Sequence, residues 1–318
     1  MMNYPSIENI QSALRLISPF VHRTPVITSE LLNQMFQCQL FFKCENMQKA
    51  GAFKYRGATH AILCLTEAEK RKGVATHSSG NHAAALAKAA SLSGIPAYIV
   101  MPKNAPKVKI EAVRAYCGII TFCEPTLQAR ELELQKVIEK TGAVLVHPYD
   151  NFNVVCGQGT ACLEIAEQME VPDIVMAPVG GGGLLSGTAI SAKNIWPNVR
   201  VIGAEPFNAN DACESFKNKK LIPVQNPSTI ADGLRTSLSP FTYSIISNFV
   251  DDILPCSEKA IVDAMALIFQ YLKVVIEPSS AVPLACIMEN RDKFKGKKVA
   301  IILSGGNVDL ANLPFKTN

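Results

Sequence analysis

The sequence lacks blocks of like charge, long apolar runs and paired cysteine motifs. Its 31 basic and 27 acidic residues leave a net charge of +4 without a basic cluster, so nucleic-acid binding is not indicated. Its apolar runs are far too short to cross a bilayer and no apolar leader opens the chain, so we expect no membrane partner. The ten cysteines are scattered and never form C-x-x-C, which favours reduced thiols in a soluble cytoplasmic protein.

Metal-ligand spacing is also missing among the five histidines, so no zinc site is predicted. The composition that remains is ordinary for a globular enzyme, with 48% hydrophobic and 18% charged residues. A length of 318 residues is enough for one large or two modest domains.

Apolar stretches typical of strands alternate with helical patterns along most of the chain. The predicted strands are 40–45, 74–76, 97–101, 119–123, 143–146, 173–179, 199–204 and 299–303. The predicted helices between and after them are 83–92, 107–116, 127–140, 157–169, 184–195 and 257–275. Residues 206–256 are expected to form loops and short helices over the site. This alternation predicts two α/β domains, each an open, mostly parallel sheet with helices on both faces, sharing one cleft.

The stretch Gly51–Gly57 (GAFKYRG) holds a single lysine between an aromatic residue and flexible glycines, ahead of a predicted helix at 58–65. Phe53 would desolvate the amine of Lys54, and desolvation lowers the pKa of a lysine. A neutral amine is the nucleophile that Schiff-base chemistry requires. An ordinary solvated lysine is the alternative, and only the motifs downstream argue against it.

Four consecutive glycines, Gly180–Gly183, follow an apolar strand and open a helix. Bare N–H groups at a helix N-terminus bind anions, most often phosphate. A nicotinamide dinucleotide site is the serious alternative, because Glu205 closes the next strand near the place of a ribose-binding acid. Against it, Ser186 occupies the last position of G-x-G-x-x-G, and the lysine stretch would have no function.

Two further polar motifs follow predicted strands. Ser78–His82 (SSGNH) offers N–H groups, hydroxyls and an amide that could hold a carboxylate and a phenolic oxygen, although a polar helix cap is the alternative. Ser304–Asn307 (SGGN) ends a buried strand and, alone, would be taken for a loop. Glu205 and Asp211, six positions apart, could bind a hard cation or remain solvated carboxylates.

Together and in this order, the motifs resemble the fold-type II pyridoxal-phosphate enzymes of the serine/threonine dehydratase and serine racemase family, whose fold is like that of the tryptophan synthase β subunit. The resemblance implies that Lys54 holds the cofactor covalently, Asn81 meets its phenolic oxygen and Ser304 faces its pyridine nitrogen. The positions implied for the cofactor are Phe53, Lys54, Asn81, Gly180, Gly181, Gly182, Gly183, Leu184 and Ser304. Those implied for the substrate are Ser78, Ser79, Asn81 and His82.

The resemblance also implies a chemistry. A neutral Ser304 makes the cofactor a weaker electron sink than a charged partner would, which favours rapid loss of a β-hydroxyl from hydroxy amino acids. Ser79 stands where dedicated threonine dehydratases have alanine and racemases have serine, so a second acid–base group on the opposite face is implied. Tyr149 replaces the asparagine of mammalian racemases and favours dehydratase character.

The same family implies magnesium or manganese bound by Glu205, Asp211 and the carbonyl of Ala209, although Phe207 and Asn210 depart from its loop pattern. It implies a large cofactor domain of residues 1–67 and 149–318 and a small domain of residues 68–148. A homodimer and a nucleotide effector such as ATP are further family expectations. We thus expect a serine/threonine ammonia-lyase with serine racemase activity; the alternatives are a 3-hydroxyaspartate dehydratase and a NAD-dependent dehydrogenase.

Overall fold

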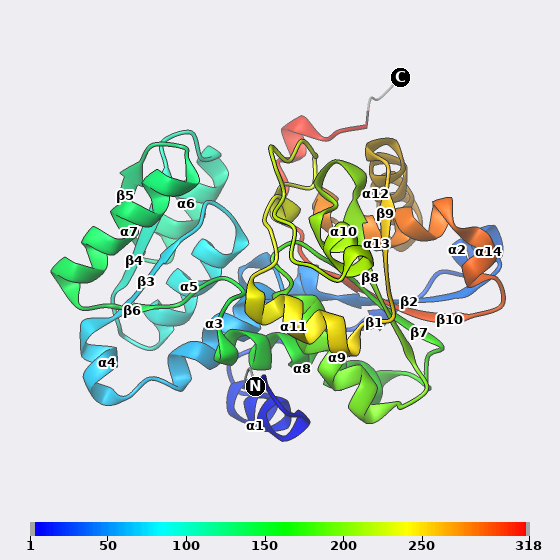
Figure 1. The fold of residues 1–318 in the computed structure, drawn as a ribbon, viewed down its shortest axis with the longest axis horizontal. Coiled ribbons are helices and arrows are strands. Elements are labelled where there is room, and N and C mark those ends of the chain that lie inside the picture. Colours follow the sequence, from blue (N-terminus) through cyan, green and yellow to red (C-terminus); the bar gives the residue numbers. More distant parts are fainter. Residues whose placement is uncertain (1–3, 316–318) are drawn as a thin grey trace.

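The computed structural model describes residues 4–315 and shows two lobes, each built on its own sheet (Figure 1). The larger sheet has six strands in the order β1-β2-β10-β7-β8-β9, and the smaller has four in the order β5-β4-β3-β6. All neighbours in both sheets are parallel except β1, which runs antiparallel to β2. The predicted α/β class with open, mostly parallel sheets is confirmed.

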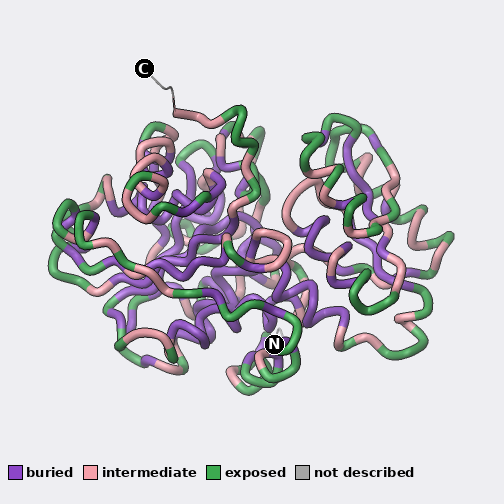
Figure 2. Tube along the Cα trace, turned by 180° about the vertical axis from the view of Figure 1, so that it is seen from behind, coloured by how far each residue is buried: buried purple, intermediate pink, exposed green. Residues whose placement is uncertain are grey.

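The larger sheet forms the centre of the molecule. Its strands are β1 (Val26–Ile27), β2 (Gln39–Cys44), β7 (Ile174–Pro178), β8 (Arg200–Pro206), β9 (Asp252–Cys256) and β10 (Lys298–Leu303). Side chains alternate between its faces: Met176 packs in the cluster with α2, α12 and α13, whereas Val175 packs in the cluster with α8, α9 and α11. Burial on both faces explains why these strands are apolar throughout, and Figure 2 shows them in the buried interior.

The helices of the larger lobe come from both ends of the chain. They are α1 (Ile7–Ile17), α2 (Glu30–Phe36), α3 (Lys54–Leu63), α8 (Phe152–Gln168), α9 (Gly183–Ile195), α10 (Asp211–Asn218), α11 (Pro240–Phe249), α12 (Glu258–Leu272), α13 (Pro278–Glu289) and α14 (Arg291–Phe294). Short 3-10 turns are η1 (Glu45–Met47), η2 (Lys49–Gly51), η3 (Phe207–Ala209), η4 (Asp232–Leu234) and η5 (Leu310–Asn312).

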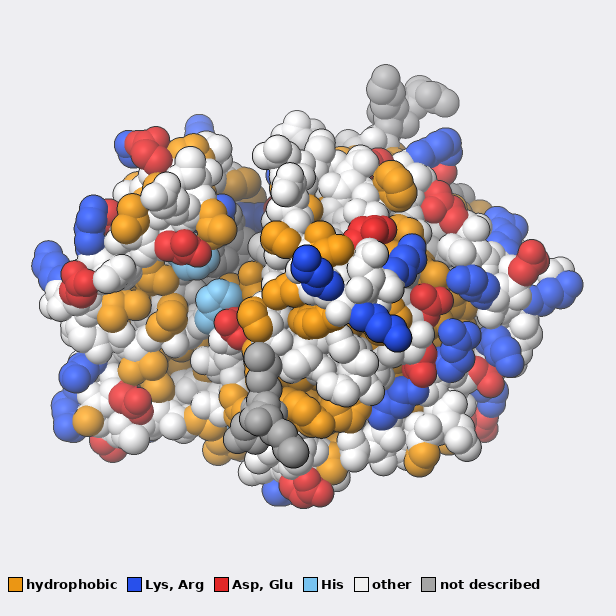
Figure 3. Space-filling view, viewed as in Figure 1, with side chains coloured by type: hydrophobic (Ala, Val, Ile, Leu, Met, Phe, Trp, Pro, Cys, Tyr) orange, Lys and Arg blue, Asp and Glu red, His pale blue; other side chains and the backbone are white. Residues whose placement is uncertain are grey.

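The smaller lobe is built from the part of the chain between α3 and α8. Its strands are β3 (Val74–His77), β4 (Ala97–Pro102), β5 (Ile119–Cys123) and β6 (Val144–Leu145). Its helices are α4 (Glu67–Lys72), α5 (Asn81–Leu92), α6 (Lys107–Ala115) and α7 (Leu127–Thr141). The alanine-rich α5 packs on one face of the sheet and α7 on the other. A hollow separates the two lobes in the space-filling view, with histidine side chains on its wall (Figure 3).

Several predicted elements need correction. The helix expected at 58–65 begins at Lys54, so Gly57 lies inside α3 and serves close helix packing instead of loop flexibility. A Cβ at Gly57 would come within 2.8 Å of the Val154 carbonyl of α8, and one at Gly157 within 2.6 Å of Gly57 itself. The segment 206–256 holds the expected short helices, α10 and α11, but also a strand, β9, that was not expected.

Helix α13 was not predicted, and its internal Pro283 is the reason, since proline ordinarily signals a helix end. The expected helix 257–275 stops at Leu272, where Lys273 adopts a left-handed conformation with φ of 60°. Across residues 4–315, no helix is long and apolar enough to span a membrane.

Candidate active site

Lys54 is the first residue of α3 and lies at the junction of the predicted motifs. The turn before it is tied to the SGGN turn: the Phe53 N–H donates to the Ser304 carbonyl at 3.0 Å, and Ala52 forms a bridge with Gly305. The amine of Lys54 donates to the Pro148 carbonyl at 2.8 Å and lies 5.1 Å from the centre of the Phe53 ring. Desolvation lowers the pKa of Lys54 to about 8, although Glu277 opposes the shift. A useful fraction of this amine is therefore neutral near pH 7.

The glycine loop packs against Tyr149, next to the carbonyl that accepts from Lys54. Gly180–Gly183 connects β7 to α9, and Gly182 has φ of +85°, a conformation that side chains disfavour. A Cβ on Gly181 would overlap the ring of Tyr149, the residue that follows the Pro148 acceptor of Lys54. The loop therefore needs glycine for close approach as well as for turning. Its N–H groups at the start of α9 have the arrangement that suits an anion, as the sequence predicts.

The SGGN turn contains a pair of buried serines. Ser304 follows β10 and its hydroxyl lies 3.1 Å from that of Ser280 in α13. Ser280 donates its single hydroxyl hydrogen to the Gly305 carbonyl at 2.6 Å and accepts from the Gly305 N–H at 2.7 Å. The bond between the two hydroxyls is therefore donated by Ser304, whose hydrogen can also rotate toward another acceptor. Ser280 had no sequence signal, because a serine inside an unpredicted helix looks like any polar residue.

The SSGNH motif opens α5, with Asn81 as its first helical residue and Ser78 and Ser79 in the preceding turn. The Ser78 hydroxyl accepts from the Gly80 N–H at 3.3 Å. His82 is only 2% exposed, and its Nε2 lies 2.9 Å from the Val146 carbonyl. Burial, with Lys54 nearby, lowers the pKa of His82 to about 3, so its ring is neutral. The group of His82 that remains for a carboxylate is its backbone N–H at the helix N-terminus.

Asn81 links the two lobes. Its side-chain Nδ2 donates to the Glu277 carboxylate at 2.7 and 3.0 Å, and its Oδ1 accepts from Asn307 Nδ2 at 3.0 Å. Asn307 also donates to the Ala50 carbonyl, next to the lysine turn. Glu277 precedes α13 and escaped the sequence analysis, because its neighbours in space are distant along the chain. The lysine turn, the SSGNH turn and the SGGN turn thus share one hydrogen-bonded cluster.

The predicted cation ligands lie behind the glycine loop. Glu205 ends β8 and accepts from the N–H groups of Ala212 and Cys213 at 3.1 and 2.9 Å. Asp211 begins α10; its Oδ2 accepts from the Leu238 N–H at 3.3 Å and its Oδ1 is buried without a protein partner. Burial raises the pKa of Asp211 to about 7, and burial together with Asp211 raises that of Glu205.

Neither carboxylate has an ion-pair partner within residues 4–315, and no cluster of three His, Cys, Asp or Glu side chains that could hold a metal occurs there. A cation would therefore need a backbone ligand, and the buried Ala209 of η3 lies between the two acids in sequence. Leu238 also touches the glycine loop, since a Cβ on Gly182 would lie 2.7 Å from its Cδ2. Leu238 therefore connects Asp211 to the glycine loop.

Comparison with known proteins decides between the cofactor classes that the glycine loop left open. The family model described as "Pyridoxal-phosphate dependent enzyme" matches residues 17–305. The chain belongs to the pyridoxal-phosphate dependent enzyme family. It is an enzyme of this class, as the sequence analysis expected, and the nicotinamide alternative is set aside.

Three similar proteins place the chain within the pyridoxal-phosphate dependent enzymes. The beta-hydroxyaspartate dehydratase of Paracoccus denitrificans is 49% identical over 314 residues, covering 99% of this chain and all (100%) of that protein. The structure of maize serine racemase is 46% identical with a TM-score of 0.95, covering 97% of this chain and 95% of that one. The structure of a threonine deaminase from T.th. is 40% identical with a TM-score of 0.93, covering 97% of this chain and 100% of that one.

Pyridoxal phosphate fits the groups in this site. The phosphate matches bare N–H groups of a glycine loop whose close packing leaves no room for a Cβ at Gly181. The aldehyde matches the amine of Lys54, and the ring nitrogen matches a serine hydroxyl with a hydrogen to donate. The Nδ2 atom of Asn81, which donates to Glu277, carries two N–H groups, and such a donor suits an acceptor such as the phenolic oxygen.

Proposed function

We propose that this protein is a pyridoxal-phosphate-dependent ammonia-lyase of L-serine and L-threonine that also racemises serine. The observation that carries the proposal is the desolvated amine of Lys54. Its acceptor Pro148 precedes the tyrosine that packs on the glycine loop, and the turn before it is bonded to the Ser304 carbonyl. The similarity to a dehydratase, a serine racemase and a threonine deaminase over nearly the whole chain supports the same reaction class.

The proposed roles follow from the chemistry of each group. When bound, the cofactor withdraws electrons from Cα of an attached amino acid and acidifies its hydrogen. Lys54 would hold the cofactor and, once released, take the Cα proton on its own face, which its lowered pKa allows near neutral pH. Gly180–Gly183 and Leu184 would bind the phosphate through backbone N–H groups, and Phe53 would pack against the cofactor ring.

The turn before α5 would bind the substrate. The N–H groups of Asn81 and His82 stand at the positive end of the helix dipole, and the Ser78 and Ser79 hydroxyls lie in the preceding turn; both suit a carboxylate. Racemisation needs an acid–base group on the face opposite Lys54, and we assign it to Ser79. A serine hydroxyl is a poor base at its ordinary pKa, so racemisation should be slower than elimination.

The proposal includes a divalent cation, magnesium or manganese, at Glu205, Asp211 and the Ala209 carbonyl. The unpartnered Oδ1 of Asp211 and the repulsion between two buried acids support it, because a cation would satisfy the oxygen and neutralise the pair. The proposal also takes residues 1–67 and 149–318 as the cofactor domain and 68–148 as the small domain, in agreement with the membership of the two sheets. A homodimer, a nucleotide effector and a cytoplasmic location are parts of the proposal to which no described residue is assigned.

Incubation with L-serine, L-threonine, D-serine and 3-hydroxyaspartate tests the function. We expect keto acid and ammonium from L-serine and L-threonine, and D-serine from L-serine at a lower rate. The purified protein should absorb in the violet and lose that band on borohydride treatment, with the label on Lys54. A colourless protein that consumes none of these substrates would refute the proposal.

A 3-hydroxyaspartate dehydratase is the second candidate function, favoured by similarity to the Paracoccus denitrificans enzyme. Such a substrate carries a second carboxylate, which requires a cation. Arg130 of α7 lies near His77 and Tyr149, where it acts on the pKa of both, and it forms no ion pair within the described residues. A kcat/KM for 3-hydroxyaspartate well above that for L-serine would select this candidate.

A further inference from the structure

Glu277 is a buried acid in an unusual position. It is the N-cap residue of α13 and only 3% exposed, yet its side chain makes no capping hydrogen bond to the helix. An acidic N-cap ordinarily accepts from the N–H groups of the first turn, which stabilises the helix. Glu277 forgoes this contribution, and no ion pair compensates its carboxylate within residues 4–315. A buried carboxylate held in this way calls for a function beyond helix capping.

The carboxylate is directed at the other lobe instead. Both of its oxygens accept from Asn81 Nδ2, at 2.7 and 3.0 Å, across the boundary between α13 and α5. The opposite end of the same amide, Oδ1, accepts from Asn307 Nδ2 at 3.0 Å. A carboxylate can only accept when charged, so an inverted amide would set two acceptors against each other at Glu277. The pair Glu277 and Asn307 therefore selects one of the two amide orientations.

The selected orientation places a donor over the SGGN turn. A Cβ on Gly305 would lie 3.0 Å from Asn81 Nδ2 and 2.7 Å from Glu277 Oε1, so both groups crowd the residue that follows Ser304. The Glu277 N–H in turn donates to the Gly305 carbonyl at 3.0 Å. Glu277 thus connects the helix that carries Asn81 to the strand end that carries Ser304.

We infer that Glu277 is a positioning residue of the cofactor site, which holds the Asn81 amide across the cleft with its donor end facing the cofactor. The inference rests on the proposed function, since it concerns how that site is assembled. The Nδ2 atom of Asn81 carries two N–H groups, so it has the capacity to donate both to Glu277 and to an acceptor on the cofactor. Without the carboxylate, Asn81 would lose the contact that fixes its donor end and would keep only the contact of its oxygen with Asn307.

The charges around Glu277 set the conditions for a test. Asp232 of η4 and Lys109 of α6 form an ion pair across the same boundary, and Lys54 faces the carboxylate from α3. Burial raises the pKa of Glu277 to about 7, with Asp232 adding to the shift, while Asn81, Lys109 and Lys54 oppose it. Glu277 is in turn the charge that raises the pKa of Lys54, and His82 and His147 are the other titratable groups near that amine.

A double-mutant cycle on cofactor affinity tests the inference. Apoenzyme of the parent, Glu277→Ala, Asn81→Ala and the double variant is titrated with pyridoxal phosphate, and the dissociation constant is read from absorbance. Loss of a hydrogen bond to a charged group predicts weakening of roughly 10- to 100-fold for Glu277→Ala. In the Asn81→Ala background, Glu277→Ala should weaken cofactor binding little further, because the amide that Glu277 positions is already absent. Glu258→Gln is the matched control: that acid also stands at a helix start, and it accepts from the Ile230 N–H.

The outcomes separate the inference from the proposed function. A parent apoenzyme that takes up no pyridoxal phosphate contradicts the function itself. A parent that binds the cofactor, with Glu277→Ala binding equally well or with additive effects in the cycle, overturns only the positioning role.

Glu277→Gln keeps the inference testable if the alanine variant does not fold. Glutamine retains one acceptor oxygen for Asn81, so affinity and melting temperature should stay close to those of the parent. The charge that raises the pKa of Lys54 is lost, so that pKa falls and the neutral amine is present at lower pH. The midpoint of the pH profile for the rate of cofactor uptake should therefore lie at lower pH than in the parent. A profile that does not move, or affinity as weak as that of Glu277→Ala, would contradict the assignment.

Discussion

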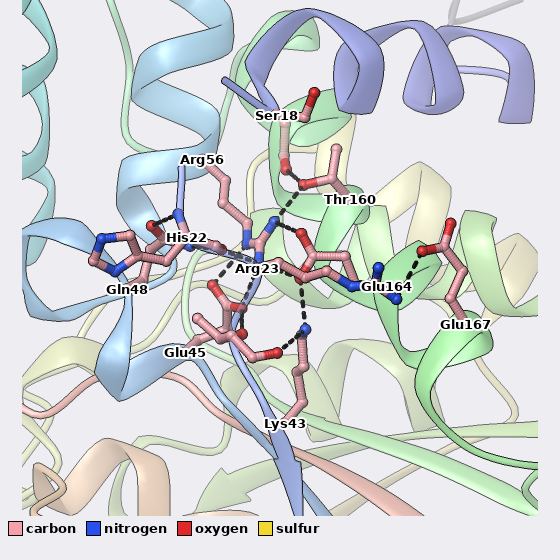
Figure 4. Close-up of polar contacts among 12 residues, drawn as sticks. Ser18, His22, Arg23, Lys43, Glu45, Gln48, Arg56, Thr160, Glu164 and Glu167 are labelled. Atoms are coloured by element: carbon pink, nitrogen blue, oxygen red, sulfur yellow. Dashed lines mark hydrogen bonds and ion pairs between the residues drawn. The ribbon is translucent and has the colours of Figure 1, made fainter. Parts of the chain in front are cut away.

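Replacement of Arg56 by methionine should destabilise the protein strongly, because this residue lies two positions after Lys54 at the centre of a buried ion network (Figure 4). Its guanidinium donates to both oxygens of Glu45, at 2.7 and 2.8 Å, and to both oxygens of Glu164, each at 2.7 Å. Arg56 is fully buried (0% exposed), and among residues 4–315 the only other cation in the cluster is Lys43, which bonds to Glu164 at 2.6 Å.

The magnitude follows from the charges left behind. With Arg56 the cluster has two cations and two carboxylates; without it, one buried carboxylate is uncompensated. Removal of one partner from a buried ion pair costs about 3–5 kcal/mol, chiefly through this uncompensated charge. That is a large share of the roughly 5–15 kcal/mol by which a domain is stable. The loss should also loosen the start of α3 and thereby weaken cofactor binding through Lys54.

Urea unfolding followed by circular dichroism measures the effect, with Arg23→Met as the matched control. Arg23 pairs with Glu167 at 3.0 Å in the same region, but both side chains are more than half exposed (57% and 55%). Solvent screening limits such a pair to about 1 kcal/mol or less. An Arg56→Met variant no less stable than the Arg23→Met variant would refute the reasoning.

The pH dependence gives a second check on the same variant. Burial alone would raise the pKa of Glu45, but Arg56, with smaller contributions from Lys43 and Thr24, holds that pKa below its ordinary value. The stabilisation from Glu45 is therefore present above the pKa of the unfolded chain and is lost as pH falls through the folded value. The difference in the free energy of unfolding between the parent and Arg56→Met should therefore become smaller at acid pH.

Three further predictions concern the site. Ser79→Ala should abolish conversion of L-serine to D-serine and elimination from D-serine, while most elimination from L-serine and L-threonine survives; Lys54→Ala should remove every activity. Chiral chromatography measures the racemisation and keto-acid assays measure the elimination. Unchanged racemisation in Ser79→Ala would reject Ser79 as the second base. Arg130→Gln should lower kcat/KM for 3-hydroxyaspartate by roughly tenfold or more, the scale of a lost charge-assisted hydrogen bond, and leave L-serine little changed; equal losses for both substrates would contradict the assignment. Magnesium at 100 times its dissociation constant should stabilise the parent by about 2.7 kcal/mol, seen as a rise in melting temperature, and Asp211→Asn should lose this rise; an unresponsive parent would exclude the site.

Features that depend on local backbone chemistry were predictable from the sequence. Alternating apolar strands and amphipathic helices indicated two parallel sheets, and the fold confirms them. A run of glycines indicates a tight turn or a close contact from the sequence alone, because side chains disfavour both. Gly182 has a left-handed φ of +85°, and Gly181 lies against Tyr149 with no room for a Cβ. Helix caps such as Ser29 and Thr66 are local in the same sense, since the side chain of a cap bonds to a residue three positions away.

Features that depend on burial and on distant contacts were decided by the tertiary structure alone. Glu277 and Asn81 are 196 positions apart, and nothing near either residue indicates that one orients the other. His82 reads as a polar ligand in the motif, yet the fold buries its ring against the Val146 carbonyl and leaves only its backbone for a substrate. The sequence by itself thus determined where the chain turns and which chemical groups stand at each turn. Only packing of the two lobes decided which of those groups meet, because desolvation and pairing depend on neighbours that local pattern does not encode.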